Sequence, residues 1–211
     1  MSLNPQDHYI RVVFSLLQNH LEKRSCLQLC NTMGDGRLNS IHDEDTIANY
    51  ILEFFGAVIK RGKSRELGDL WLDMSPYNLQ DLPINIKCLN EKPGQRNNLF
   101  GLPKFFAYTF DDQTCTSKVG VAKTVKSALQ DKLLNKYGLV IVSKDSSKCW
   151  VGTLDEIPDL DISANPSNDF QLAWPSSRIS RTNQEYREML TTKLHELYKK
   201  MAEPLKVFES L

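Results

Sequence analysis

The spacing of apolar residues along the chain predicts where its helices and strands lie. In residues 8–23, Ile10, Val13, Phe14 and Leu17 recur three or four positions apart, which predicts a helix with one buried face. The same spacing predicts further helices at residues 43–60, 121–137 and 183–201.

Strands are predicted where apolar and β-branched residues run together between turn residues. Residues 69–74 and 82–89 are expected to form two strands, and an antiparallel hairpin is the simplest way to join them. A second hairpin is predicted from residues 139–143 and 148–154, which flank a short polar turn.

Together these elements predict an α/β or α+β domain in which a mixed central β-sheet is flanked by helices. Residues 99–110 are expected to add a helix, with strand in part of the segment as the alternative, and residues 155–180, rich in Pro, Asp and Ser, are expected to be irregular. No internal repeat and no long linker divides the 211 residues, so we expect one domain, with 41% apolar residues to fill its core.

Composition bears on compartment more than on activity. Basic and acidic residues both number 26, so bulk charge does not indicate a nucleic-acid partner. No apolar run approaches the roughly 18 residues that span a bilayer, and residues 1–10 lack the pattern of a secretory signal. Five cysteines without a paired CxxC suit a reducing compartment. We therefore expect no membrane contact and a cytoplasmic location.

Residues 68–87, which read GDLWLDMSPYNLQDLPINIK, carry the candidate chemistry. Asp69 opens the first strand of the hairpin, and Asn85 and Lys87 lie two positions apart on the second. Since alternate residues of a strand point to the same side, Asn85 and Lys87 are expected to project together while their apolar neighbours turn toward a core. This is nearly the layout of a metal-dependent phosphodiesterase site. The alternative is an ordinary hairpin with Asn85 and Lys87 on its solvated face.

These three residues resemble the PD-(D/E)XK nuclease signature, and the chain resembles type II restriction endonucleases in particular. A preceding helix with an acid near its start, Glu44, and the closing RTNQEYREML segment add to the resemblance, which covers residues 40–110 most clearly. It implies a single nuclease-like domain with a restriction-endonuclease-like fold. The helix at residues 183–201 would then pack on this domain or on a dimer partner.

The resemblance implies Mg²⁺-dependent hydrolysis of phosphodiester bonds at specific sequences in double-stranded DNA, within a restriction-modification system, with Mn²⁺ able to replace Mg²⁺. Asp69 is the main expected ligand. The amide oxygen of Asn85 and the backbone carbonyl of Ile86 are further expected ligands. Asp73 is a candidate ligand that would substitute for the acid missing at position 85. Lys87 is expected beside the attacking water and the scissile phosphate, where its charge would stabilise the developing negative charge.

Asn85 departs from the signature, because the family has an acid at this position. An amide oxygen can bind a metal or water but brings no negative charge. Three explanations stand: a natural variant supported by Glu44 or Asp73, an inactivating substitution, or a protein that binds DNA without cutting it. We favour the natural variant, since the strand around Asn85 is otherwise intact. The main rival is a non-cleaving DNA-binding or protein-interaction module with a degenerate nuclease site.

Glu44 is the candidate site residue on the predicted helix 43–60. At 100° per residue it falls near the apolar stripe, three positions before Ile47, so we expect it to face inward. The alternative is that Asp43, Glu44 and Asp45 only favour the positive end of the helix dipole.

Sequence-specific cleavage also requires side chains that read base edges. Polar and basic candidates gather in two segments, which are equally typical of solvated loops: Lys92, Gln95, Arg96, Asn97, Asn98, Arg178, Arg181 and Asn183. The resemblance further implies a homodimer with twofold symmetry that acts on a palindromic target.

Overall fold

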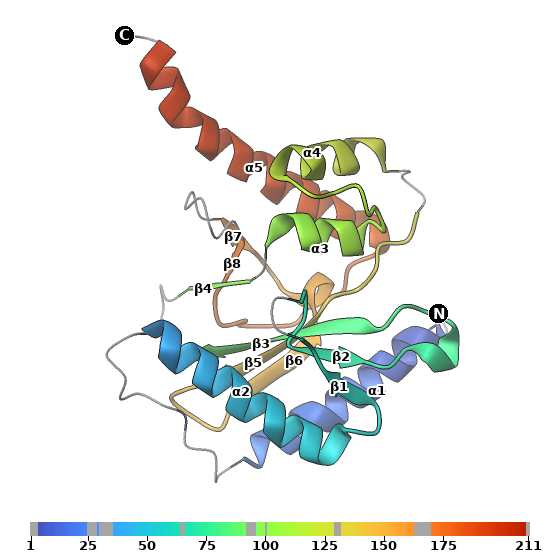
Figure 1. Ribbon diagram of the computed structural model, residues 1–211. Helices are drawn as coiled ribbons and strands as arrows, with labels where there is room; N and C mark the ends of the chain where they lie inside the picture. The colour runs from blue at the N-terminus through green and yellow to red at the C-terminus, as the bar shows by residue number, and fades with distance from the viewer. Residues whose placement is uncertain are drawn as a thin grey trace. The chain divides into compact units, whose positions relative to one another are not determined.

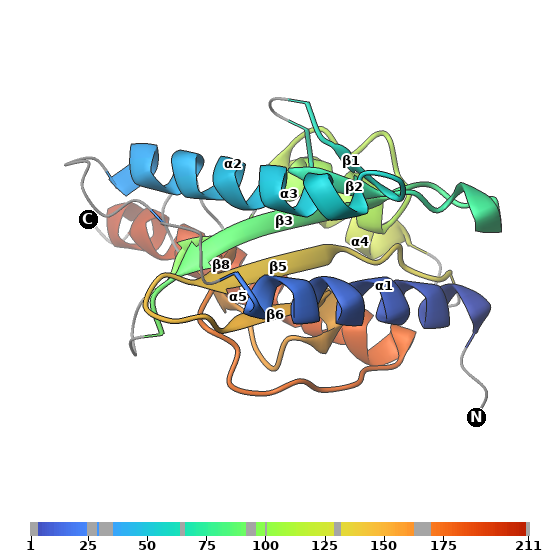
Figure 2. The same ribbon diagram turned by 90° about the horizontal axis from the view of Figure 1, so that it is seen from below.

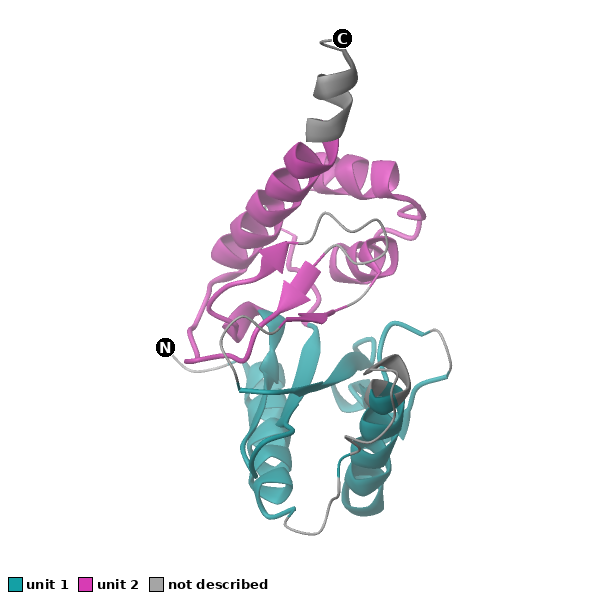
Figure 3. Cartoon of the chain, turned by 90° about the vertical axis from the view of Figure 1, so that its left-hand side faces the viewer, with its two compact units in different colours: residues 1–95, 137–154 teal, residues 96–136, 155–211 magenta. Residues whose placement is uncertain are grey.

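The computed structural model describes residues 4–24, 29, 36–63, 66–91, 96–99, 101–128, 132–162 and 170–209. The chain groups into two compact units (Figure 3). Unit 1 comprises residues 1–95 and 137–154, and unit 2 comprises residues 96–136 and 155–211. The expectation of one nuclease-like domain stays a prediction, and each unit is described by itself.

Unit 1 is built on a five-stranded mixed sheet in the order β1-β2-β3-β5-β6 (Figure 1). Its central strands β3 and β5 pair in parallel, and the other three pairings are antiparallel. This confirms the predicted class, a mixed α/β fold with a central sheet flanked by helices. The strands are β1 (Ile59–Arg61), β2 (Leu70–Leu72), β3 (Leu82–Leu89), β5 (Gly138–Ser143) and β6 (Cys149–Thr153).

Two helices pack against this sheet. Figure 2 shows α1 (Pro5–Glu22) alongside β6 and α2 (Gly36–Phe55) alongside β3. Apolar side chains of both helices join alternate residues of the strands in one hydrophobic core, and Leu17, Ile47 and Ile86 are fully buried there. The face of the sheet that carries these strand residues is thereby closed to solvent.

Helix α1 confirms the helix predicted at residues 8–23, with an earlier start. The side chain of Asn4 accepts a hydrogen bond from the Gln6 N–H, and Pro5 occupies the first helical position. Both features favour a helix start, because a cap satisfies an otherwise unbonded N–H and proline has none to satisfy.

Helix α2 departs from the prediction at both ends. It begins at Gly36, seven residues before the predicted start at residue 43, and ends at Phe55 rather than residue 60. Ile59, which fits the apolar period of the helix, instead pairs with Leu72 as part of β1. A helical spacing cannot reveal this partner, because the partner lies on another segment of the chain.

Both predicted hairpins are confirmed, β2 with β3 and β5 with β6. The 3-10 helix η1 (Ser75–Tyr77) lies in the first turn, and η2 (Leu154–Glu156) follows β6. All eight residues of β3 are buried, as are all six of β5, which is expected for central strands.

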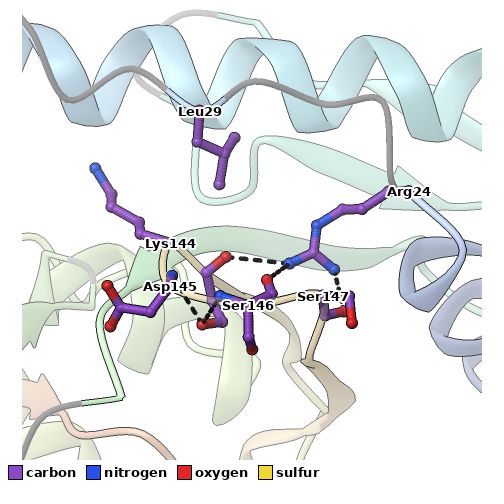
Figure 4. Close-up of a pocket in the computed structure, with 7 residues that line it drawn as sticks. Arg24, Leu29, Lys144, Asp145, Ser146 and Ser147 are labelled. Atoms are coloured by element: carbon purple, nitrogen blue, oxygen red, sulfur yellow. Dashed lines mark hydrogen bonds between the residues drawn. The ribbon is translucent and has the colours of Figure 1, made fainter.

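Arg24 ties the end of α1 to the turn between β5 and β6 (Figure 4). Its guanidinium donates hydrogen bonds of 2.6–3.1 Å to five backbone carbonyls, and its pKa is lowered by burial. A pocket lies beside this turn, and Arg24 and Lys144 both line it. Their side chains lie on opposite sides of the turn (Figure 4). The carbonyls belong to Leu21, Ser143, Ser146, Ser147 and Lys148.

Unit 2 combines three helices with a three-stranded sheet in the order β4-β8-β7. The predicted helix at residues 99–110 corresponds to α3, whereas α4 starts at Lys118 and ends at Ser127, ten residues before the predicted end. The segment 155–180 is not wholly irregular, because it contains β7 and β8. The elements are β4 (Asn97–Asn98), α3 (Leu102–Thr109), α4 (Lys118–Ser127), β7 (Asp161–Ile162), β8 (Phe170–Leu172) and α5 (Asn183–Glu209).

Helix α5 begins where the last helix was predicted and runs eight residues past residue 201. No helix among the described residues has the length and apolar character that a membrane crossing requires.

We expect Glu91→Gln to lower the free energy of unfolding at neutral pH. Hydrogen bonds from Lys148, Ser146 and Ser143 lower the pKa of Glu91 from 4.5 to about 2. At pH values above its ordinary pKa of 4.5, the ionised carboxylate therefore makes its full contribution to the free energy of unfolding. This contribution is lost as the pH falls toward about 2. Urea unfolding across this pH range measures the difference.

The exposed Glu53→Gln serves as the control and should leave stability within about 0.5 kcal/mol. A difference between the Glu91 proteins that does not shrink on acidification would contradict the assignment.

Candidate active site at the open edge of strand β3

Strand β3 places Asn85 and Lys87 together, as predicted. Its alternate residues Ile84, Ile86 and Cys88 belong to the hydrophobic core. Asn85 and Lys87 are each only 8% exposed, which excludes the alternative of a solvated hairpin face. Among the described residues, no hydrogen-bond partner is found for the buried Oδ1 of Asn85, although buried polar groups ordinarily have one.

Asp69 lies directly before β2 and binds the edge of β3. The ladder between β2 and β3 ends at the pair Leu70 and Ile84, and the Ile86 N–H donates a 2.7 Å hydrogen bond to Asp69 Oδ2. A carboxylate thus takes the hydrogen bond that a longer β2 would accept. The N–H and C=O of a strand residue point to the same neighbour, so the Ile86 carbonyl also faces this edge.

The backbone around Asp69 is held on both sides. The Gly62 N–H donates a 2.8 Å hydrogen bond to the Asp69 carbonyl. The hydroxyl of Tyr137, a fully buried residue, donates another of 2.8 Å to the Leu67 carbonyl. These bonds fix the position from which the Asp69 carboxylate reaches β3.

Glu44 approaches the same edge from α2. Its Oε1 lies 3.0 Å from Lys87 Nζ, and the two side chains are only 19% and 10% exposed. Burial raises the pKa of Glu44, although the positive charge of Lys87 acts in the opposite direction. The nearby charge of Asp69 also raises this pKa, so the two carboxylates lie within electrostatic range of each other.

The position of Glu44 decides between the two interpretations of its helix. Because α2 begins at Gly36, Asp43, Glu44 and Asp45 lie about two turns into the helix. A helix dipole acts mainly on groups in the first turn, so it does not account for these acids.

A cleft opens beside Glu44 and Asp69. Glu66 lines this cleft, and its side chain is held there because Oε2 accepts hydrogen bonds from the Lys63 N–H and from Trp71 Nε1. Among the described residues, Asn85 and Lys87 do not line this cleft, and Lys87 is connected to it through Glu44. The lining residues are Ile41, Glu44, Asp45, Arg61, Gly62, Lys63, Glu66, Gly68 and Asp69.

The oxygen atoms at this edge suit a hard divalent cation. The carboxylates of Asp69 and Glu44, the amide of Asn85 and the Ile86 carbonyl are ligand types that Mg²⁺ accepts while it keeps several waters. Within the part of the chain that the structure describes, no group of three or more His, Cys, Asp or Glu side chains could hold a metal. Any cation here therefore depends on the amide and the carbonyl as well as on acids.

Asp73 does not join this group. It follows β2 at the strand's far end from Asp69, about 13 Å along an extended chain. Its carboxylate accepts hydrogen bonds from the Ser75 N–H and from Lys60, and the bonds from Ser75 and Lys60 lower its pKa. Asp73 is thus committed to a turn rather than to the candidate site.

Several predicted base-reading residues have structural partners. Arg181 donates hydrogen bonds to the carbonyls of Asp155, Ile157 and Pro158. The side chain of Asn183 accepts a hydrogen bond from the Leu134 N–H and donates one to a carbonyl. Both side chains therefore have structural roles within unit 2, and their assignment as base readers stays a prediction.

The other residues that were predicted to read base edges differ in the contacts that they make. Arg96 forms an ion pair with Asp161, and Arg178 forms one with Glu156. Asn97 and Asn98 form β4, where the side-chain oxygen Oδ1 of Asn98 accepts a hydrogen bond from Nε2 of Gln171. Lys92 and Gln95 lie outside the described residues.

Sequence reasoning missed a second acid and lysine beside the site. Asp43 is fully buried on α2, and its Oδ2 lies 2.6 Å from Nζ of Lys144, the residue that follows β5. The sequence signal for Asp43 was its place four residues before the apolar Ile47, which puts both side chains on the same face of the helix.

The chain was also compared with known proteins. No family model matches it, and no curated protein matches it at a significant level.

Two glycines make the approach of Asp69 to β3 sterically possible. A Cβ atom at Gly62 would overlap the carbonyl oxygen of Gly68, and one at Gly68 would lie 2.7 Å from the Leu70 carbonyl oxygen. We expect Gly62→Ala to lower the free energy of unfolding by on the order of 1–3 kcal/mol, because backbone must move to admit the methyl group. Urea denaturation measures the loss.

Gly120→Ala is the matched control, because a Cβ there makes only contacts of 3.4 Å or more. Since Gly120 lies in α4, this variant should be neutral or gain about 0.5–1 kcal/mol. Equal stability of the Gly62 variant and the unmodified protein would show that the backbone contact is not tight.

Proposed function

We propose that this protein is a Mg²⁺-dependent, sequence-specific endodeoxyribonuclease of the type II restriction class, with a restriction-endonuclease-like fold in unit 1. One observation carries the proposal: Glu44, Asp69 and Lys87, from three separate segments, meet at the open edge of β3. The buried and unsatisfied oxygen of Asn85 supports it, because a ligand supplies the partner that this oxygen lacks among the described residues.

The cation would be held by Asp69, Asn85 and the Ile86 carbonyl, with Glu44 as the nearest further carboxylate. When bound, Mg²⁺ supplies a positive charge that stabilises negative charge on phosphoryl oxygens and favours ionisation of a bound water. Mn²⁺ accepts similar oxygen ligands and is expected to replace it.

The chain's own residues have distinct tasks in this proposal. The Lys87 ammonium, held by Glu44, offers positive charge to a phosphodiester oxygen or orients the attacking water. Asp69 supplies the negative charge that attracts the cation, and its hydrogen bond from Ile86 keeps the carboxylate from rotating away. Water adds to phosphorus, the bond to the leaving oxygen breaks, and that oxygen takes a proton.

The substrate of the proposed reaction is double-stranded DNA. Arg96, Arg178 and the segment that contains Lys92 and Gln95 are candidate contacts, whereas Arg181 and Asn183 also have structural roles. A homodimer with a palindromic target and a cytoplasmic location stay part of the proposal. The homodimer and the palindromic target follow from the resemblance to restriction endonucleases, and the location follows from the composition of the sequence rather than from the geometry of the site.

A second candidate is a DNA-binding or protein-interaction module that does not cut. The amide at Asn85 favours it, since the site has one negative charge fewer than the signature requires. The substitution Asn85→Asp distinguishes the two candidates. In a non-cleaving module with a degenerate nuclease site it would create cleavage activity, whereas in an active nuclease it would only change the rate of cleavage.

We expect the purified protein with Mg²⁺ to cut DNA of varied sequence into discrete fragments. Asp69→Ala and Lys87→Ala should each reduce the rate at least about 100-fold, because each removes a charge that acts on the reacting phosphate. Asp73→Ala should cut normally, since Asp73 pairs with Lys60 away from the cleft. Gel electrophoresis of the fragments reads out all three variants.

Cleavage that survives Lys87→Ala would contradict the assigned site. The absence of cleavage by both the unmodified protein and Asn85→Asp would refute the nuclease function.

We further expect Asn85→Asp to bind the cation more tightly and to be less stable without it. A buried carboxylate one residue from the Asp69 contact adds unpaired negative charge, at a cost on the order of several kcal/mol. Thermal unfolding at increasing Mg²⁺ should therefore show a larger rise in Tm for this variant than for the unmodified protein. Asn85→Ala is the control and should show the smallest rise. The same Mg²⁺ dependence in all three proteins would exclude Asn85 as a ligand.

A further inference from the structure

Asp43 is a fully buried charged group beside the candidate site that the proposed reaction does not use. Its side chain is 0% exposed, and its partner Lys144 is 15% exposed, with 2.6 Å between Oδ2 and Nζ. Moving a carboxylate and an ammonium out of water costs several kcal/mol per ion, and replacing such a pair by apolar side chains is often neutral or stabilising. Stability alone therefore does not account for an ion pair at this position.

The pair has the same composition as the one in the candidate site, an acid of α2 with a lysine of a central strand or its end. Asp43 and Glu44 are consecutive on α2 and so point about 100° apart around the helix axis. Their lysines come from the two central strands: Lys87 lies on β3, and Lys144 directly follows β5. The Lys144 N–H donates a 2.9 Å hydrogen bond to the Leu89 carbonyl, which joins the two strand ends.

Cys88 shows how closely the four charges are grouped. Burial, followed by the charges of Asp43 and Glu44, raises the pKa of its thiol to about 12, and the two lysines act in the opposite direction. All four charges therefore act on a single side chain next to Lys87.

We propose that Asp43 and Lys144 are positioning residues, which fix the rotation of α2 so that the Glu44 carboxylate stays on the Lys87 ammonium. The inference rests on the proposed nuclease function and deepens it. Two contacts that point about 100° apart determine the rotation of a helix, whereas one contact leaves the helix free to turn about it. Without the pair between Asp43 and Lys144, α2 would be oriented by apolar contacts, which have no direction of their own, and by the exposed ion pair between Asp45 and Arg61, which contributes little.

The test compares Asp43→Asn, which removes the charge and keeps the shape, with the double variant Asp43→Asn/Lys144→Met, which leaves no uncompensated buried charge. Leu17→Ala, a fully buried change on α1, controls for lost stability. All are assayed at a temperature where circular dichroism shows them folded. Displacing Glu44 should lower kcat on the order of 100-fold in both Asp43 variants, with KM for DNA little changed. Leu17→Ala should keep the unmodified kcat.

A double-mutant cycle with Glu44→Gln separates positioning from structural support. If Asp43 acts through Glu44, adding Asp43→Asn to Glu44→Gln should lower kcat no further. Additive losses would overturn the inference.

A readout independent of cleavage is the crystal structure of either Asp43 variant. Positioning requires that the contact between Glu44 and Lys87 be lost, and its retention at 3.0 Å would overturn the inference even if the protein cuts DNA. If the unmodified protein does not cut, the proposed function fails, and this contact still decides the role of Asp43.

Discussion

The candidate site depends on the hydrogen bond that Ile86 donates to the carboxylate of Asp69. At this point a side chain replaces a strand as the partner of β3, so the sheet has an open edge at its central strand. If β2 began several residues before Leu70, its backbone would occupy this edge. That backbone would then lie between Glu44 on α2 and Lys87 on β3. The end of one short strand therefore allows three functional groups to meet.

Charge balance explains why an amide is tolerated at position 85. Asp43 and Glu44 each form an ion pair with a lysine, so the charges of these four groups, of which Asp43 and Lys87 are buried, sum to zero. Asp69 then adds the negative charge that a cation would neutralise. An acid in place of Asn85 would bury one more negative charge, whereas the amide supplies an oxygen ligand without that cost.

Sequence periodicity predicted what local spacing determines and missed what distant segments determine. The first helix, both hairpins and the shared face of Asn85 and Lys87 depend on neighbours along the chain. The start of α2 and the pairing of Ile59 depend instead on segments far away in the sequence. Because the helix was predicted to start at residue 43, Asp43 was interpreted as an acid that favours the positive end of the helix dipole. The hydrogen bonds of Arg181 were not predicted for the same reason, because its carbonyl partners lie 23 to 26 positions away in the sequence.

Unit 1 is discontinuous in sequence, since residues 96–136 belong to unit 2. The order in which the chain leaves the ribosome therefore matters. Glu44, Asp69 and Lys87 are all made before β5, but the lysine that neutralises Asp43 and the strand that completes the centre of the sheet come more than 50 residues after Lys87. A nascent chain that ends before β5 lacks both that lysine and the parallel partner of β3. The candidate site can therefore be completed on its central sheet only after β5 has been synthesised.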